Sequence, residues 1–150
     1  MASILLLSGP NLNLLGTREP EHYGTATLDD HVATAVRVAS SFGHDLVALQ
    51  SNHEGVLIDA VHAARGVHQG IIINGAAFTH SSWALHDALA AYDGPIIELH
   101  ISNADAREPW RRTSVLSPVA TGTIAGFKGD GYRIAVDAMS VLLANESVVT

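Results

Sequence analysis

Cysteine is absent from this chain of 150 residues, and lysine occurs once, as Lys128. Without cysteine the protein has no disulfide bond, no thiolate zinc site and no cysteine nucleophile. The single lysine lies in the glycine-rich stretch 126–131, which is not the buried apolar setting that lowers a lysine pKa for Schiff-base chemistry. The sequence therefore gives little support to covalent catalysis through a thiol or an amine.

Positive charge and long apolar runs are also scarce. Lysine and arginine number 8 against 15 aspartates and glutamates, so the formal net charge is −7. Nucleic acids and anionic membranes bind proteins that neutralise phosphate charge, so neither is an expected partner. No stretch approaches the ~20 apolar residues that cross a bilayer, and the apolar run 4–7 is too short for a signal peptide. We therefore expect a cytoplasmic protein that binds neither nucleic acid nor membrane.

The apolar residues that are present predict the fold class. They make up 47% of the chain, against 15% charged residues, which is enough for a core. Short apolar runs predict strands at 4–7, 45–50, 70–74, 95–101 and 122–126. Apolar residues at helical spacing predict helices over 28–42, from about 57 to 66, from 81 or 82 to 92, and over 132–145. This alternation is typical of a parallel sheet covered on both faces, so we expect residues 1–150 to form one α/β domain.

Polar side chains gather where a ligand site belongs in such a fold. Parallel sheets bind ligands just beyond the carboxyl ends of their strands. Amides and imidazoles follow the expected strands there: Asn11, Asn52, His53, Asn74 and His80. Solvated loops are polar too, so this pattern indicates a place for the site without naming its chemistry.

The segment 8–26 lacks helix or strand periodicity and is long for a loop, which is typical of a lid. Near its end, Arg18, Pro20, Tyr23 and Gly24 have the spacing R-x-P-x-x-Y-G. An arginine beside a phenol favours the phenolate and lowers a tyrosine pKa from its usual value of about 10, so Tyr23 is a candidate base. The alternative, which the residues alone favour, is that Tyr23 packs on the base of the loop and Arg18 is a surface charge.

Glu98, His100 and Ser102 alternate along the fourth predicted strand, so all three point to one side. A neighbouring carboxylate favours protonated imidazole, which makes His100 a candidate acid. The alternative is a core histidine bonded to a backbone carbonyl.

Three further patterns carry weaker signals. Arg107, Arg111 and Arg112 suit a carboxylate or polyol, or equally a solvated face anchored by Trp110. The glycines of 126–131 do not follow the GxGxxG order of a dinucleotide loop. A metal could in principle be held by four residues without an HExxH spacing: His80, His86, Glu98 and His100.

Several runs then occur in a fixed order along nearly the whole chain. They are Ser8–Gly16, Arg18–Gly24, Gln50–Gly55, Asn74 with Thr79-His80, Glu98–Asn103, Arg107, Arg111-Arg112 and Leu116–Gly122. Together they resemble the type II 3-dehydroquinate dehydratases. Two segments depart from that pattern: Ser8 stands where an asparagine is usual, and Gly75–Phe78 replaces a more typical turn.

The resemblance implies a flavodoxin-like fold with a five-stranded parallel sheet. It implies trans elimination of water from 3-dehydroquinate to 3-dehydroshikimate through an enolate, in the shikimate or quinate pathway, without metal or cofactor. It also implies a homododecamer, built as a tetramer of trimers.

The resemblance assigns roles to twelve residues of this sequence. Tyr23 is the base for the C2 proton, Arg18 lowers the pKa of its phenol, and His100 protonates the departing hydroxyl. Asn11, through a water, stabilises the enolate oxygen, while Glu98 orients His100. Substrate contacts are implied for the rest: Asn74, Ile101 and Ser102 at the carboxylate, His80, Arg111 and a neighbouring subunit's Asp87 at the ring hydroxyls, and Arg107 in support.

Two other functions compete with this interpretation. A flavodoxin-type module that holds FMN or a phosphorylated partner predicts a loop rich in Ser, Thr and Gly after the first strand, where this chain has asparagines and leucines. A histidine-based metal hydrolase predicts activity that chelators abolish.

Overall fold

Five parallel strands form one sheet at the centre of the computed structural model, which describes residues 1–149. The strands are β1 (Ser3–Ser8), β2 (Asp45–Gln50), β3 (Gly70–Asn74), β4 (Ile96–His100) and β5 (Gly122–Ala125). Their order across the sheet is β2-β1-β3-β4-β5, the flavodoxin-like order, with every pair parallel. The predicted strands and fold class are confirmed, with ends that differ by one residue.

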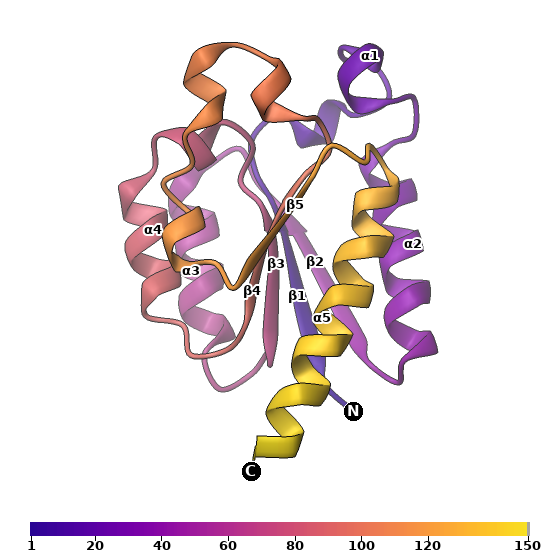
Figure 1. Ribbon diagram of the computed structural model, residues 1–150, viewed down its shortest axis with the longest axis vertical. Coiled ribbons are helices and arrows are strands. Elements are labelled where there is room, and N and C mark those ends of the chain that lie inside the picture. The colour runs from indigo at the N-terminus through magenta and orange to yellow at the C-terminus, as the bar shows by residue number, and fades with distance from the viewer. Residues whose placement is uncertain (150) are drawn as a thin grey trace.

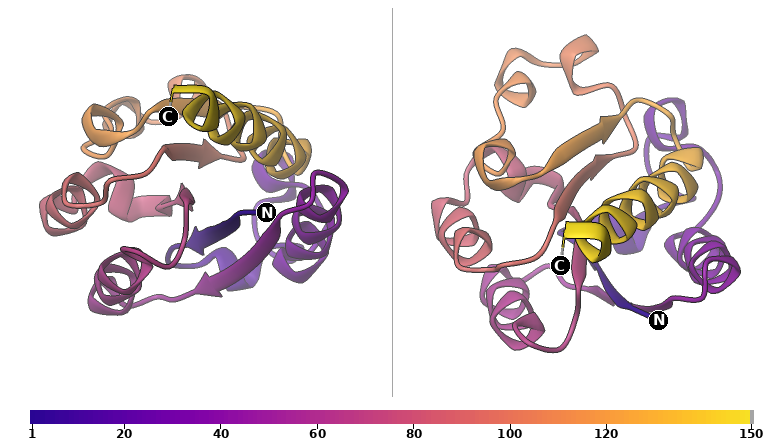
Figure 2. Two further views of the ribbon diagram at one scale, coloured as in Figure 1. Left: turned by 90° about the horizontal axis from the view of Figure 1, so that it is seen from below. Right: turned by 60° about the horizontal axis from the view of Figure 1, so that its bottom comes forward.

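Helices cover both faces of this sheet (Figures 1 and 2). The helices α2 (Leu28–Ser41) and α5 (Asp130–Val149) pack together on one face, and α3 (Glu54–Ala64) and α4 (Trp83–Ala90) pack together on the other. Among the described residues no helix is long and apolar enough to cross a membrane.

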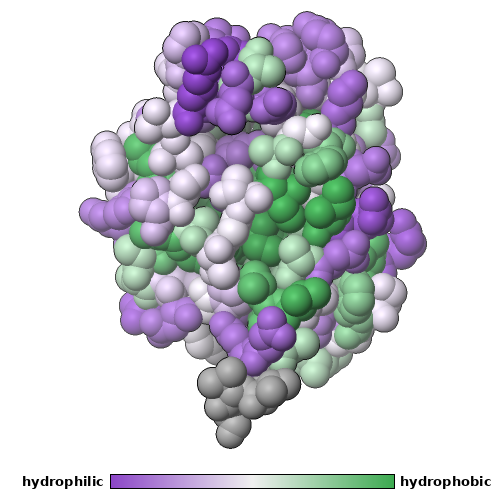
Figure 3. Space-filling model, in the orientation of Figure 1, coloured by the Kyte–Doolittle hydropathy of each residue, from purple (hydrophilic) through white to green (hydrophobic). Residues whose placement is uncertain are grey.

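The central strands divide the core into two clusters because alternate side chains point to opposite faces. Ile4 and Leu6 of β1 join the cluster beneath α2 and α5, whereas Leu5 and Leu7 join the cluster beneath α3 and α4. The edge strands β2 and β5 are largely exposed. Beside β5, apolar side chains of β4, β5 and α5 line a shallow groove, and Figure 3 shows apolar surface gathered over these elements: Ile97, Ile124, Ala138, Val141 and Leu142.

Local signals place the helix ends. Thr27 and Asp30 form a capping box in which the Thr27 hydroxyl accepts from the Asp30 amide at 3.2 Å and Asp30 accepts from the Thr27 amide at 2.9 Å. Ser82 caps α4, since its hydroxyl accepts from the Leu85 amide at 3.0 Å. The last helix, α5, starts at Asp130 instead of the predicted residue 132 and is longer than predicted. Gly131 lies in its first turn without interrupting it.

The predicted lid is more ordered than its sequence indicated. It contains the 3-10 turn η1 (Leu12–Leu14) and the short helix α1 (Pro20–Tyr23). Pro20 starts α1 because its fixed φ suits a first helical position, and Gly24, at φ +81°, ends it. The expectation of a segment without helix was therefore wrong, because one-turn helices leave no apolar periodicity. The connection from β4 to β5 is likewise built of 3-10 turns: η3 (Ala104–Ala106), η4 (Pro109–Arg112) and η5 (Ser117–Val119).

Candidate active site

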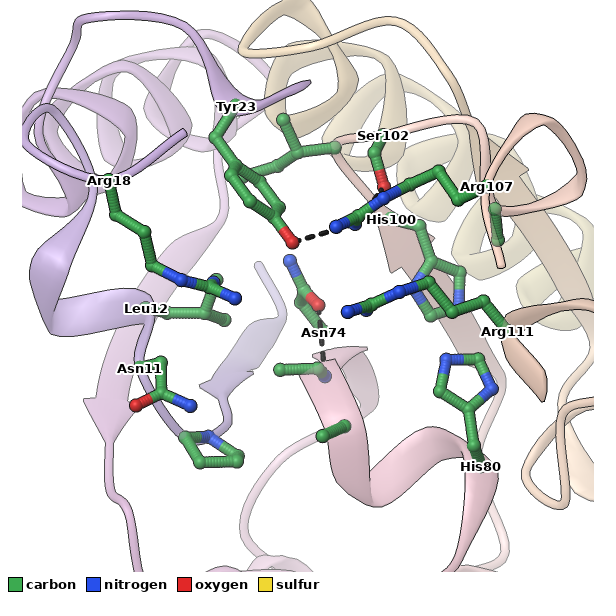
Figure 4. A pocket seen from close by; sticks show the side chains of 15 residues that line it. Asn11, Leu12, Arg18, Tyr23, Asn74, His80, His100, Ser102, Arg107 and Arg111 are labelled. Carbon is green, nitrogen blue, oxygen red and sulfur yellow. Dashed lines mark hydrogen bonds between the residues drawn. The ribbon is translucent and has the colours of Figure 1, made fainter. Parts of the chain in front are cut away.

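A pocket lies at the carboxyl ends of the strands, between the lid, the start of η2 (Ala76–His80) and the turns after β4 (Figure 4). Its lining includes all the predicted site residues except Glu98 and Asp87: Asn11, Arg18, Tyr23, Asn74, His80, His100, Ile101, Ser102, Arg107 and Arg111. These residues come from segments up to 100 positions apart in the sequence, from Asn11 to Arg111. The rule that parallel sheets bind ligands at this edge gives the correct location.

Tyr23 points from α1 into the pocket and is 8% exposed. Its hydroxyl accepts a hydrogen bond from Arg107 Nη1 at 2.7 Å, and the same nitrogen donates to Ser102 Oγ at 3.3 Å. The Arg18 guanidinium lies over the ring instead, with its central carbon 5.0 Å from the ring centroid. Two guanidinium groups therefore flank the phenol, and the one that bonds to the hydroxyl is Arg107, not the Arg18 that the R-x-P-x-x-Y-G spacing indicated.

A carboxylate lies between these two cations. Glu19 Oε2 is 3.2 Å from Arg18 Nη2 and 3.9 Å from Arg107 Nη2. The Arg107 side chain is 4% exposed, so its charge needs a nearby anion or hydrogen-bond acceptor. Glu19, which sequence reasoning did not single out, supplies one.

Glu98 is buried directly behind His100, as the strand alternation predicted. His100 Nε2 lies 2.5 Å from Glu98 Oε2, while Ser114 Oγ and Ser117 Oγ donate to Glu98 Oε1 at 3.0 and 2.8 Å. Burial opposes the charged form, but hydrogen bonding and charge from His100, with the bonds from Ser117 and Ser114, outweigh it and hold the pKa of Glu98 below its ordinary value. Glu98 is therefore ionised, and its hydrogen bonds to Ser114, Ser117 and His100 hold it in position beside the imidazole.

Asn74 ends β3 and is 3% exposed. Its Oδ1 accepts from the Ala76 amide at 3.2 Å, and in Figure 4 its nitrogen faces the middle of the pocket. Asn11 is held at the pocket rim by its backbone, whose amide donates to Asn52 Oδ1 at 3.0 Å and whose φ is +69°. Hydrogen bonds that involve backbone amides therefore fix the positions of both asparagines at the pocket.

His80 and Arg111 close the side of the pocket opposite the lid. His80 Nδ1 lies 2.7 Å from the Thr113 carbonyl oxygen, which requires a proton on Nδ1. Arg111 Nε donates to Glu108 at 2.6 Å, and its guanidinium lies 4.1 Å from the Trp110 ring centroid. Arg111 thus lies against Trp110 and also lines the pocket, and binding of a carboxylate or polyol by this cluster stays a prediction.

Asp87 does not line the pocket. Its side chain is 83% exposed on α4 and pairs with His86 Nδ1 at 3.0 Å. The predicted role of this aspartate in a neighbouring subunit's site is compatible with that exposure and stays a prediction.

The four residues considered for a metal do not form a ligand group within residues 1–149. His80 bonds to a backbone carbonyl and His86 to Asp87, so neither joins Glu98 and His100. The group found there with ligand atoms within 4.8 Å of one another is Glu19, Glu21 and His22 on the lid, where Glu19 already pairs with Arg18.

The comparisons with known proteins agree on one family. The sequence profile described as "Dehydroquinase class II" matches residues 2–140. This chain belongs to the class II dehydroquinases. It is 51% identical to the 3-dehydroquinate dehydratase of Ruegeria pomeroyi over 97% of this chain and 98% of that protein. It is 54% identical to the catabolic 3-dehydroquinase of Aspergillus clavatus over 93% of each.

Solved structures of type II dehydroquinases have the same fold as this family member. The enzyme from Butyrivibrio crossotus matches with a TM-score of 0.90 and 41% identity, over 92% of this chain and 97% of that one. The enzyme from Propionibacterium acnes matches with a TM-score of 0.90 and 40% identity, over 94% and 97%.

Ser114 and Ser117, whose hydroxyls bond to Glu98 behind His100, were not singled out from the sequence. Ser117 belongs to the run Leu116–Gly122 that carried the resemblance, so a signal was present, but nothing in the run indicates that its hydroxyl reaches a glutamate 19 positions away. The departure at Gly75–Phe78 places Ala76 and Ala77 in the pocket wall.

Proposed function

We propose that Tyr23 and His100 carry out the trans elimination of water from 3-dehydroquinate, through an enolate, to give 3-dehydroshikimate. The overall reaction follows from family membership: the chain is a 3-dehydroquinate dehydratase, a hydro-lyase of the shikimate or quinate pathway. The observation that carries the proposed mechanism is that a phenol bonded to a buried guanidinium and an imidazole bonded to a buried carboxylate line the same pocket.

Tyr23 is the base in this proposal. A proton next to a ketone is weakly acidic, so its removal needs a strong base such as a phenolate. In this proposal the Arg107 hydrogen bond and the Arg18 guanidinium over the ring stabilise negative charge on the phenol oxygen during the reaction. Tyr23 takes the C2 proton as the phenolate and leaves an enolate.

His100 is the acid. It donates a proton to the departing C1 hydroxyl, and the ionised Glu98 stabilises the imidazolium that makes this possible. The base and the acid belong to different elements, α1 and β4, and line the same pocket.

The remaining residues bind charge and hydroxyl groups. Asn11, through a water, stabilises the enolate oxygen, and one such donor is typically worth about 3–4 kcal/mol. Asn74, Ser102 and the backbone of Ile101 hold the carboxylate, with Arg107 supporting both Ser102 and Tyr23. His80 and Arg111 hold the ring hydroxyls. No step of the proposed reaction requires a metal or an organic cofactor.

Assembly completes the site in this proposal. Residues 1–150 form one catalytic domain, and twelve copies form a cytoplasmic tetramer of trimers in which Asp87 reaches a neighbouring copy's pocket. The exposure of Asp87 supports this arrangement, and so does the apolar groove beside β5, where Val141 is 60% exposed.

The test is turnover of 3-dehydroquinate, followed by the ultraviolet absorbance of the conjugated enone product. Activity is expected to survive borohydride and exhaustive chelation and to fall by about 100-fold or more in Tyr23→Phe and in His100→Ala. Tyr92→Phe is the matched control, because Tyr92 Oη bonds to the His68 carbonyl far from the pocket. Full activity in Tyr23→Phe refutes the base, and loss of activity on borohydride treatment points to an imine.

A further inference from the structure

The hydroxyl of Tyr132 is a buried polar group that the proposed mechanism does not use. Tyr132 lies in the first turn of α5 and is 1% exposed. Within the described residues its hydroxyl has no hydrogen-bond partner of acceptable geometry. Buried hydroxyls are nearly always paired, so one that is not needs an explanation.

Two polar side chains end the strands beneath this tyrosine. Ser8 of β1 and Asn74 of β3 are register partners at the carboxyl edge of the sheet. Ile4, Leu6 and Ile72 belong to the core cluster that contains Tyr132, and side chains two residues apart share a face. Ser8 and Asn74 therefore face the same side as Tyr132, and both are buried.

The electrostatics of the hydroxyl identify the same two groups. Burial raises the pKa of Tyr132 to about 12, and hydrogen bonding from the side chains of Asn74 and Ser8 opposes part of that rise. Asn74 and Ser8, which the strand register places on the same face as Tyr132, are thus the two side chains that act on the hydroxyl, although neither makes a hydrogen bond of acceptable geometry with it.

The tyrosine ring is the fixed member of this group. It stacks on His31 of α2 with the ring centroids 4.9 Å apart and an interplanar angle of 6°. The backbone of Gly129 lies against the His31 ring, so tightly that a Cβ there would overlap it. Asn74, by contrast, is held at Oδ1 by the Ala76 amide and keeps two N–H donors on Nδ2.

We propose that Tyr132 is a positioning residue for Asn74. Its hydroxyl oxygen accepts one N–H of Asn74 Nδ2, so that the carboxamide, whose Oδ1 accepts from the Ala76 amide, is held at both ends and its second N–H is directed at the substrate carboxylate. This inference rests on the proposed role of Asn74 in binding that carboxylate.

Steady-state kinetics of Tyr132→Phe test the proposal. The variant keeps the ring and its stacking, so the melting temperature stays within a few degrees of the parent. The KM for 3-dehydroquinate is expected to rise about tenfold while kcat changes less than about threefold, because a ground-state contact is weakened. Tyr92→Phe is the control, because it removes the hydrogen bond from the Tyr92 hydroxyl to the His68 carbonyl at the opposite end of the sheet. Its melting temperature is expected to fall while its KM stays the same.

A double-mutant cycle separates positioning from a general structural effect. In an Asn74→Ala background, Tyr132→Phe is expected to change KM less than about twofold, since nothing remains to be positioned. An unchanged KM in Tyr132→Phe, or an equal rise with and without Asn74, overturns the proposal. If Asn74→Ala alone leaves KM unchanged, the binding role of Asn74 fails first and the role of Tyr132 fails with it.

Discussion

Arg107 Nη1 donates to the Tyr23 hydroxyl at 2.7 Å, and the two residues are 84 positions apart in the sequence. The bond joins the lid helix α1 to the turn after β4. The same nitrogen contacts Ser102, so one buried guanidinium links the candidate base to the segment that follows β4. The position of the lid and the state of the phenol oxygen therefore depend on the same side chain.

Replacing Arg107 by lysine is expected to lower kcat by about 100-fold. Arg107 Nη1 donates to both Tyr23 and Ser102 while Nη2 lies near Glu19, and a single ammonium cannot occupy the positions of both nitrogens, so support of the phenol oxygen is weakened although the charge is kept. Arg133→Lys is the control, because Arg133 is half exposed and pairs with Asp137 on the surface of α5. Stopped-flow or steady-state assays measure kcat, and parental activity in Arg107→Lys contradicts the assignment.

Removal of the two serines behind Glu98 should weaken both the fold and the acid. Ser114 and Ser117 each give a hydrogen bond to a carboxylate that is 1% exposed, and such a bond contributes about 1.5–3 kcal/mol. Ser114→Ala with Ser117→Ala is expected to lower the free energy of unfolding by about 3 kcal/mol and kcat by about tenfold or more. Urea titration and kinetics measure the two effects. Ser41→Ala, which removes one hydroxyl bonded to its own helix, is the control.

Acid should destabilise the protein in two steps. Burial lowers the pKa of His31 and of His68 in the folded state, so the unfolded chain binds more protons below pH about 6.5 and stability falls there as pH decreases. Glu98 has a lowered folded pKa, so its contribution is present above its unfolded value near 4.3 and is lost as pH falls through the folded value. Unfolding free energies from pH 7 down to about pH 2 check both steps, and His31→Phe is expected to flatten the first step. An unchanged slope between pH 7 and 5 in His31→Phe would contradict the assignment.

The sequence predicted the strands well because β1 and β3 are buried on both faces and therefore read as uninterrupted apolar runs. It also predicted that Glu98 and His100 lie side by side, because residues two apart in a strand point to the same side. The one-turn helix α1 was missed because four residues are too few for a period.

The site was predicted least well where it depends on long-range contacts. Tyr23 and Arg18 are near in sequence, and that proximity suggested their pairing, whereas the bond from Arg107 depends on how the lid docks. Ser114 reaches Glu98 through a turn whose amides at Leu116 and Ser117 bond to its hydroxyl, a geometry that no spacing rule contains. Local rules thus locate the pocket, and packing decides its partners.

Mixed oligomers give the sharpest test of the shared site. Asp87→Ala is expected to raise KM about tenfold, and Tyr23→Phe to abolish turnover, so each variant alone is nearly inactive at substrate concentrations below KM. If Asp87 serves a neighbouring pocket, coassembly of the two variants creates sites that combine an intact Tyr23 with an intact Asp87 from the other subunit. Random mixing in equal amounts then restores about a quarter of the parental activity, since each of two conditions is met half the time. Asp87 is exposed and away from its own pocket, so complementation follows if the arrangement is right, whereas activity that stays at the sum of the separate variants contradicts it.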